Sequence, residues 1–291
     1  MEKTTGPSLH PTASLVEADL HCHTSASDGL LSPTEVVRLA AACGLRAVGI
    51  TDHDTIDGWV EALAAGRKYG VDIVRGIELN TDWHGVEVHI LGYEFDPESG
   101  ELPRRLEGLR RARWQRMEAI LDRLGELGIP LAVSEVERYV QGEAVGRPHI
   151  AQALVARGYA RSMREAFERY LGQGAPAYVP RFKIAPEEGI RLIRAAHGVA
   201  VLAHPGVRHL DEGIPNWVKA GLQGIEVSHS EHGPAEEKHS RELGVKYHLV
   251  ATGGSDFHGE ARKPGVALGR WGVPYAVVEQ IRALARGELD I

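Results

Sequence analysis

Short apolar strands alternate with amphipathic helices along most of this sequence. Near the amino terminus an apolar run ends at His23, a capping-box pattern begins at Ser32, and a further apolar run covers residues 47–50. The alternation returns between residues 184 and 251. This repeat predicts an α/β protein with a mostly parallel sheet and helices packed outside it.

A stretch of helical patterns interrupts the alternation. Residues 102–127 carry apolar side chains at helical spacing, and shorter helical patterns follow. We therefore expect three parts. A discontinuous barrel comprises residues 15–95 and 184–291, and a small helical insertion over its active site comprises residues 96–183. Residues 1–14 are expected to form a flexible amino terminus. The insertion carries more arginine and lysine than aspartate and glutamate, so it is locally basic.

The composition is that of a globular enzyme. The 291 residues are 43% hydrophobic and 25% charged, with a formal net charge of −7. Bulk charge therefore does not favour a stable complex with long nucleic acid, and no apolar run is long enough to span a membrane or act as a signal peptide. The two cysteines give no disulfide framework, so we expect buried, reduced thiols and a cytoplasmic location.

Histidines and acids follow the predicted strands at or just beyond their carboxyl ends. His21 and His23 occupy alternate positions of one strand, so both imidazoles face the same side of the sheet. A closed barrel gathers such strand ends at one mouth, whereas an open doubly wound sheet spreads them along an edge. We therefore favour a barrel, and we nominate nine metal ligands: His21, His23, Asp28, His53, Glu78, His89, His204, Asp256 and His258.

Metal ions explain these residues better than ordinary structural roles do. A lone acid at a strand end is often a helix cap, and a lone buried histidine is often a hydrogen-bonded core residue. A set of nine in one cavity would leave buried charge uncompensated unless cations lie among them. Imidazole and carboxylate ligands without thiolates suit Mn²⁺, Fe²⁺ or Zn²⁺. Such a site predicts hydrolysis of a phosphate ester, and the sequence has no serine elbow, P-loop or dinucleotide-binding glycine motif.

Six motifs of this sequence resemble those of the polymerase and histidinol phosphatase (PHP) family. They are His21-Cys22-His23-Thr24, Thr51-Asp52-His53-Asp54, Gly76-Ile77-Glu78, His89, Ala203-His204-Pro205 and Gly254-Ser255-Asp256-Phe257-His258-Gly259. The resemblance implies a distorted (β/α)7 barrel, the PHP fold, with a trinuclear centre of three divalent ions. Mn²⁺ is the first expectation, with Fe²⁺, Zn²⁺ and Mg²⁺ as alternatives.

The resemblance also implies which residues hold each ion. The first ion would take His21, His23, Glu78 and Asp256, the second would take His89 and His204 with Glu78 as a bridge, and the third would take Asp28, His53 and His258. Asp52 and Glu226 would orient ligand histidines without binding metal.

Two further segments bear on the substrate. Residues 146–151 and 180–183 flank the helical insertion and resemble the PHP branch that includes nucleoside 3′,5′-bisphosphate phosphatases, which are also 5′ to 3′ exoribonucleases. We expect Arg147 and Lys183 to bind a substrate phosphate, with structural salt bridges as the alternative explanation. His229 is expected to bind a phosphate oxygen or to protonate the leaving alcohol, which makes His229 and Arg147 the candidate catalytic residues.

These expectations combine into one predicted function. A metal-bound hydroxide would hydrolyse a phosphate ester of a small nucleotide or short oligonucleotide. The bond would be the 3′-phosphate ester of a nucleoside 3′,5′-bisphosphate, or the chain would trim short RNA or DNA from its 5′ end. Two alternatives remain open: a small-molecule monoesterase resembling histidinol phosphatase, and a PHP module without catalysis.

Overall fold

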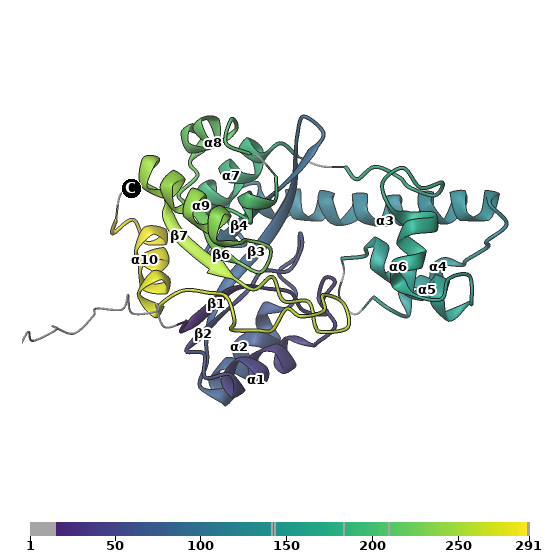
Figure 1. The fold of residues 1–291 in the computed structure, drawn as a ribbon, viewed down its shortest axis with the longest axis horizontal. Coiled ribbons are helices and arrows are strands. Elements are labelled where there is room, and N and C mark those ends of the chain that lie inside the picture. Colours follow the sequence, from purple (N-terminus) through teal and green to yellow (C-terminus); the bar gives the residue numbers. More distant parts are fainter. Residues whose placement is uncertain (1–15, 141, 143, 183, 209, 290–291) are drawn as a thin grey trace, which may run out of the picture.

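Seven strands form one sheet that curls into a nearly closed barrel (Figure 1). The computed structural model describes residues 16–140, 142, 144–182, 184–208 and 210–289. The strands follow the chain order around the sheet: β1 (Ala18–Cys22), β2 (Ala47–Ile50), β3 (Asp72–Trp83), β4 (Val86–Tyr93), β5 (Val199–Leu202), β6 (Gly224–His229) and β7 (Val250–Gly254). Just beyond β7, the backbone N–H of Asp256 donates to the carbonyl of His21 at 2.8 Å, which brings the last strand back to the first.

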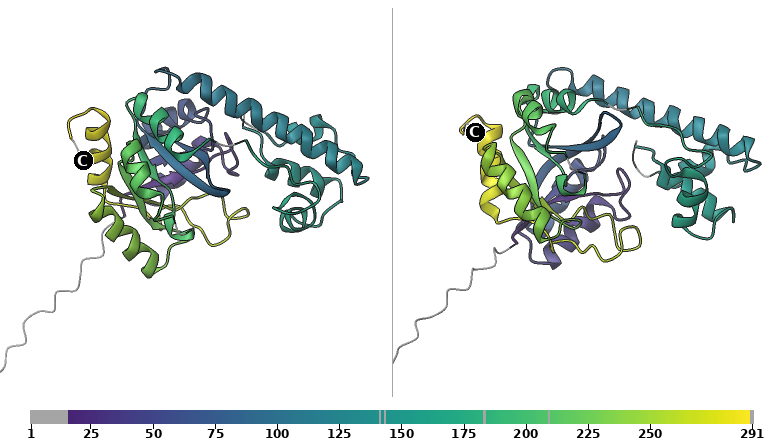
Figure 2. Two further views of the ribbon diagram at one scale, coloured as in Figure 1. Left: turned by 90° about the horizontal axis from the view of Figure 1, so that it is seen from above. Right: turned by 45° about the horizontal axis from the view of Figure 1, so that its top comes forward.

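Helices cover the outside of this barrel (Figures 1 and 2). They are α1 (Pro33–Ala42), α2 (Trp59–Tyr69), α7 (Pro186–Ala195), α8 (Ile214–Ala220), α9 (Pro234–Lys246) and α10 (Tyr275–Ala285), with a short 3₁₀ turn η2 (Pro205–Val207) after β5. The expected capping box begins α1, because Ser32 and Glu35 each accept a hydrogen bond from the other's backbone N–H. Gly70, with φ +71°, ends α2 in the left-handed conformation.

The sheet is mostly parallel, as expected, but two of its strand pairs are antiparallel. β3 pairs antiparallel with β4, and β4 pairs antiparallel with β5, whereas the other neighbouring strands are parallel. His84 and Gly85 connect β3 to β4 with φ values of +53° and +85°. Positive φ at both central residues is the requirement of a type I′ hairpin turn, and a two-residue turn joins only antiparallel strands.

Residues between β4 and β5 form a helical region beside the barrel (Figure 2). It contains α3 (Leu102–Glu126), α4 (Val133–Glu137), α5 (Arg147–Ala156), α6 (Met163–Ala166) and a π-helical turn η1 (Phe167–Leu171). Most of its buried apolar residues, among them Met117, Leu124, Ile150 and Leu154, form a cluster of their own. Leu102, Leu106 and Leu109 at the start of α3 belong instead to the core of the barrel. The bounds 96–183 of the insertion therefore stay a prediction.

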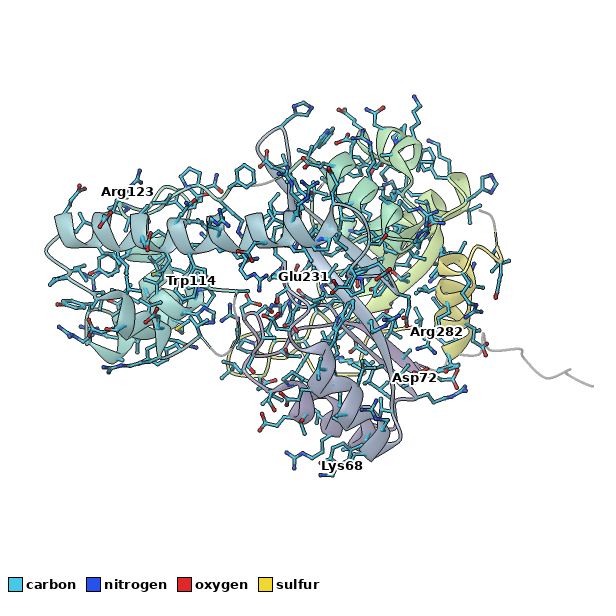
Figure 3. All side chains as sticks on the ribbon, turned by 180° about the vertical axis from the view of Figure 1, so that it is seen from behind. Lys68, Asp72, Trp114, Arg123, Glu231 and Arg282 are labelled. Atoms are coloured by element: carbon cyan, nitrogen blue, oxygen red, sulfur yellow. The ribbon has the colours of Figure 1, made fainter. Side chains whose placement is uncertain are left out.

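Two details differ from the expectations. Helix α10 was not expected, and it packs on the barrel through Arg282, whose guanidinium donates to the carboxylate of Asp72 at 2.6 Å and 3.0 Å (Figure 3). Cys22 is buried as expected, but Cys43 is exposed, because it lies at the carboxyl end of α1 on the surface.

Candidate metal centre

The structure brings the nine nominated side chains together at the mouth of the barrel. They come from the strand ends and the loops that follow them, with Glu78 on β3 and His89 on β4 projecting from the long hairpin. His21, His23 and Glu78 are buried, and the other six are at least partly buried. The convergence follows from strand geometry, since His21 and His23 share one face of β1 and the parallel strands end at a common rim.

Glu78 occupies the middle of this cluster. Its Oε1 atom lies 2.6 Å from Nδ1 of His89 and 3.3 Å from Nε2 of His204. Its Oε2 atom lies 2.9 Å from Nδ1 of His53 and 3.1 Å from Nε2 of His23. One carboxylate therefore touches imidazoles from four segments of the chain, as a ligand shared between ions would.

Groups of possible ligand atoms lie within 4.8 Å of one another in this cluster. One group contains His21, His23, Glu78 and Asp256; a second contains His23, Asp28, His53 and His258; a third contains His53, Glu78 and His89; and a fourth contains His21, Glu226 and His229. The first group has the same four members as the ligand set that the sequence resemblance implies for the first ion. The second group contains all three residues implied for the third ion, together with His23. The third group contains Glu78 and His89 of the set implied for the second ion, but not His204. Which residues hold which ion stays a prediction.

Several buried polar atoms of the cluster have no hydrogen-bond partner within the described part of the chain. They are Nε2 of His21, both ring nitrogens of His23, Oδ1 of Asp28, Oε2 of Glu78 and Nε2 of His89. A buried polar atom without a partner costs about 1–3 kcal/mol. Cations among these atoms would satisfy them, so the residues present fit a metal centre.

The charges of the cluster also suit cations. Burial opposes ionisation of Glu78, but the surrounding histidines hold the pKa of its carboxyl well below the ordinary value. Burial likewise opposes a charged His23, yet the nearby carboxylates of Asp256 and Glu78 raise the pKa of this imidazole to about 10, so it must lose a proton before it can bind a metal ion. For His53 burial prevails and lowers the pKa to about 4. The pKa values of Asp28 and Asp256 also lie well below the ordinary value, so these three acids are ionised at neutral pH, when they can act as metal ligands.

The two residues expected to orient histidines behave differently. Glu226 lies 3.2 Å from Nδ1 of His21 and accepts a hydrogen bond from the backbone N–H of His204 at 2.8 Å, which agrees with the expectation. Asp52 instead accepts hydrogen bonds from the backbone and hydroxyl of Thr24 and from the hydroxyl of Ser27. Both oxygens of Asp52 thus hold the loop that follows His23, and its expected role in orienting a histidine stays a prediction.

His229 is buried next to this cluster. Its Nδ1 atom accepts a hydrogen bond from the backbone N–H of Glu231 at 3.1 Å, so the neutral ring carries its proton on Nε2. Nε2 lies 3.8 Å from Oδ2 of Asp256 and has no hydrogen-bond partner among the described residues. A proton donor is thus directed toward the acids of the centre.

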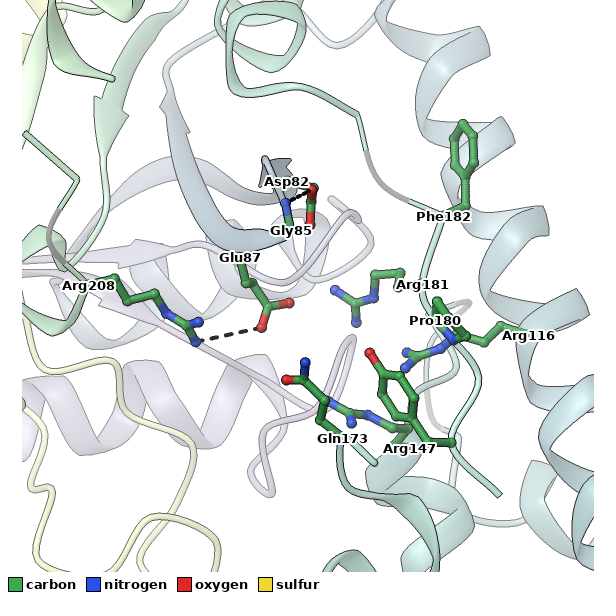
Figure 4. A pocket seen from close by; sticks show the side chains of 11 residues that line it. Asp82, Gly85, Glu87, Arg116, Arg147, Gln173, Pro180, Arg181, Phe182 and Arg208 are labelled. Atoms are coloured by element: carbon green, nitrogen blue, oxygen red, sulfur yellow. Dashed lines mark hydrogen bonds and ion pairs between the residues drawn. The ribbon is translucent and has the colours of Figure 1, made fainter. Parts of the chain in front are cut away.

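A basic pocket of about 770 Å³ lies between the insertion and the β3–β4 hairpin (Figure 4). Its walls carry Arg116 from α3, Arg147 from α5, and Arg181 and Arg208 from loops, together with Asp82, Gly85, Glu87, Gln173, Tyr178, Pro180 and Phe182. Arg208 also lines a smaller cavity of about 130 Å³, together with the candidate ligands His53, Glu78, His89, His204, Asp256 and His258. The pocket and the centre therefore adjoin at Arg208.

Three arginines of the pocket crowd one another. Burial and then the charge of Arg147 lower the pKa of Arg116 to about 10, and burial with the charge of Arg113 lowers that of Arg181 to about 9. Arg147 packs over the rings of Phe167 and Tyr178 and donates to the carbonyl of Leu171 at 3.1 Å. Positive charges held this close favour a bound anion.

Sequence reasoning found Arg147 but missed Arg116, Arg181 and Arg208. Arg116 belongs to the buried side of α3, and a charged residue on an apolar helix face was the signal that could have singled it out. The expected phosphate ligand Lys183 lies outside the described residues.

Comparison with known proteins identifies the family of this chain. The sequence profile of the PHP domain matches residues 19–173. The chain belongs to the PHP family. It is 36% identical to a 5′-3′ exoribonuclease of Haemophilus influenzae, over 82% of this chain and 89% of the relative. It is also 36% identical to a 3′,5′-nucleoside bisphosphate phosphatase of Chromobacterium violaceum, over 84% and 88%.

A solved structure of similar fold supports the same conclusion. The protein comes from Bifidobacterium adolescentis and is assigned to the metal-dependent phosphoesterases; it superposes with a TM-score of 0.85 at 32% identity, over 92% of this chain and 96% of that chain. Membership of the PHP family confirms the expected resemblance, the α/β barrel class, and an enzyme that hydrolyses phosphate esters. In the part of the chain that the structure describes, no helix is both long and apolar enough to cross a membrane.

Proposed function

We propose that this PHP protein hydrolyses a phosphate ester of a nucleotide that carries a second phosphate group. The substrate is either a nucleoside 3′,5′-bisphosphate, which loses its 3′-phosphate, or a short 5′-phosphorylated oligonucleotide. The observation that carries this proposal is that a cluster suited to cations adjoins a pocket of four arginines at Arg208. Two anionic groups of one substrate can occupy these two places at once.

Three divalent ions, Mn²⁺ in the first place, would be held by the nine nominated residues. Such ions supply Lewis acidity to a phosphoryl oxygen and lower the pKa of water. The protein keeps the acids ionised and oriented for these ions. The short contacts of Glu78 and the hydrogen bonds of Glu226 support this role. A carboxylate-rich cavity also repels anions unless cations fill it, so ion loading precedes substrate binding.

The arginine pocket would bind the phosphate that is not cleaved. A guanidinium offers a planar pair of donors that matches two phosphate oxygens. Arg116 and Arg181 have lowered pKa values partly because neighbouring guanidiniums repel them. A doubly charged phosphate bound in the pocket would relieve that repulsion. Its binding would also hold the substrate so that the ester bond is oriented at the metal centre.

His229 would protonate the leaving alcohol. The hydrogen bond from the N–H of Glu231 leaves the proton of the neutral imidazole on Nε2, which is directed toward the centre. Protonation of the departing ribose oxygen avoids the formation of a free alkoxide, which is the poorest leaving group of such a reaction.

The proposal is tested by comparing substrates with one and with two phosphates. With Mn²⁺ present, kcat/KM is measured for adenosine 3′,5′-bisphosphate, AMP, histidinol phosphate and a 5′-phosphorylated RNA trinucleotide. We expect the bisphosphate or the trinucleotide to exceed both monophosphates by at least about tenfold, the equivalent of about 1.4 kcal/mol. Equal rates for all four would remove the assigned role of the pocket, and a preference for histidinol phosphate would favour the small-molecule alternative.

A pair of variants connects the preference to the pocket. Arg181→Met should raise KM for the bisphosphate by about tenfold or more while the slow hydrolysis of AMP stays unchanged. Arg191→Met is the matched control, because Arg191 is an exposed arginine outside this pocket. If the two variants alter the bisphosphate reaction equally, Arg181 does not bind the second phosphate.

A further inference from the structure

A loop beyond the last strand carries two adjacent cations to the metal centre. Residues 259–265 follow the candidate ligand His258, and Figure 1 shows the long segment after β7 extending from the barrel toward the insertion. Arg262 and Lys263 are neighbours in this loop, and both are only partly exposed. Each of them pairs with a different candidate metal-binding carboxylate.

Arg262 holds one oxygen of Asp28 and leaves the other free. Its Nη2 atom donates to Oδ2 of Asp28 at 2.8 Å. The second oxygen, Oδ1, is buried, lies 3.2 Å from Nε2 of His258, and has no hydrogen-bond partner within the described residues. The guanidinium therefore fixes the direction in which the unpaired oxygen points, which is toward His258 and His23.

Lys263 acts on Asp256 in the same way. Its Nζ atom donates to Oδ2 of Asp256 at 2.6 Å, and it also lies 3.4 Å from Oε1 of Glu231 in the loop after β6. The other oxygen of Asp256, Oδ1, lies 3.1 Å from Nε2 of His23 and 3.5 Å from Nε2 of His21. One oxygen is thus held by the loop while the other faces the imidazoles.

The two carboxylates belong to different groups of possible ligand atoms. Asp28 groups with His23, His53 and His258, whereas Asp256 groups with His21, His23 and Glu78. Nonpolar substitution at either cation would leave a carboxylate that can rotate and that carries an uncompensated buried charge. Partners of this kind, which contact a ligand rather than the metal, typically change metal affinity by about 10–100-fold.

We propose that Arg262 and Lys263 are positioning residues that orient Asp28 and Asp256 for two separate ions. Two adjacent residues of one loop would then hold the carboxylates at two metal positions. This inference rests on the metal centre of the proposed function, but it concerns the loading of ions and is independent of which phosphate ester is cleaved. It predicts separable defects: loss of Arg262 weakens the ion at Asp28, and loss of Lys263 weakens the ion at Asp256.

The experiment measures bound metal rather than activity. The unmodified chain and the variants Arg262→Met, Lys263→Met and the double variant are loaded with Mn²⁺, freed of excess ion, and analysed for manganese content and for affinity by calorimetric titration. We expect each single variant to bind one ion at least about tenfold more weakly and the double variant to show both defects. The conservative variant Arg262→Lys should restore part of the affinity, because it still donates to Asp28.

Arg270→Met is the matched control. Arg270 lies further along the same segment, is exposed, and packs over the ring of Trp271. Its removal should leave manganese content and affinity unchanged. Thermal unfolding of the metal-free variants is recorded in parallel, and if a methionine variant does not fold, Arg262→Gln and Lys263→Gln replace it.

Two outcomes overturn the inference. One is full manganese content with unchanged affinity in folded variants at both positions; the other is an equal loss in the Arg270→Met control. If the unmodified chain loads manganese and the variants show the separate defects, but no phosphate ester of a nucleotide is cleaved, then the proposed function fails while the role of the loop stands.

Discussion

Arg113 of the insertion donates to the carboxylate of Asp54, the residue that follows the candidate ligand His53. The distance from Nε of Arg113 to Oδ2 of Asp54 is 2.9 Å, and both side chains are buried. Oδ1 of Asp54 accepts from the backbone N–H of Asn80 at 3.0 Å, and the side-chain amide of Asn80 lies 3.1 Å from Nδ1 of His53. The insertion is thus attached to the barrel directly beside the metal centre.

Breaking this ion pair should cost more than breaking a surface pair. We expect Arg113→Met to reduce the free energy of unfolding by about 3–5 kcal/mol, because it leaves the carboxylate of Asp54 buried without its cation. Chemical denaturation measures the change. In a double-mutant cycle the combination with Asp54→Asn should cost clearly less than the sum of the single variants. Additive costs would contradict a direct interaction between Arg113 and Asp54.

Divalent ions should stabilise the fold. The unpartnered atoms around Glu78 gain ligands when ions bind, and an ion at one hundred times its Kd stabilises the folded state by about 2.7 kcal/mol. Removal of metal by a chelator should therefore lower the Tm by about 5–10 °C for a chain of this size. Glu78→Gln should largely abolish this shift, whereas Glu61→Gln, on the outer helix α2, should keep it. An unchanged Tm with and without Mn²⁺ would speak against the centre.

The role of His229 depends on the leaving group. For an ester of ribose, His229→Gln should lower kcat by about 10²–10⁴-fold, because a poor leaving alcohol needs protonation. For p-nitrophenyl phosphate, whose leaving group departs without a proton, the loss should be much smaller. Rates with both esters at saturating Mn²⁺ measure the difference. Equal losses would mean that His229 supports the structure of the centre instead of donating a proton.

Acid should remove the contribution of Asp72 on the opposite side of the barrel. Burial raises the pKa of this carboxyl, but hydrogen bonds from Arg282 and Tyr275 prevail and hold it below its ordinary value of 3.8. A lowered pKa gives stability that is fully present above pH 3.8 and is lost as the pH falls through the folded value. Asp72→Asn should cost about 1 kcal/mol at pH 7, given its partial exposure, and less near pH 3. A gap in Tm that does not narrow between pH 7 and pH 3 would contradict this linkage.

The candidate centre was predictable from the sequence because its residues obey local rules. His21 and His23 share a strand face through the two-residue period, and His204 and Asp256 follow apolar runs that could be recognised as strands. Closure of the barrel then brings the strand ends together. The class of fold was therefore enough to predict that the nine residues lie together, and no knowledge of other long-range packing was needed.

The pocket was less predictable because its walls come from segments that no local rule relates. Arg116 lies on α3 and Arg208 follows β5, and only the docking of the insertion against the β3–β4 hairpin makes them neighbours. Arg116 did leave a signal, since Leu109 and Ile120 lie seven residues before it and four residues after it on the buried face of α3. Helix α10 did carry a local signal that we did not use, because its buried residues Val278, Ile281 and Leu284 recur at helical spacing.

The β3–β4 hairpin sets the distance between the metal centre and the arginine pocket. Glu78 lies in the metal centre and Asp82 lines the arginine pocket, and both belong to one face of the same strand. Because a strand advances about 3.3 Å per residue, their Cα atoms are separated by about 13 Å. A ladder of hydrogen bonds keeps this spacing constant. If the proposed function is correct, the protein would select a substrate by the distance between its two phosphates.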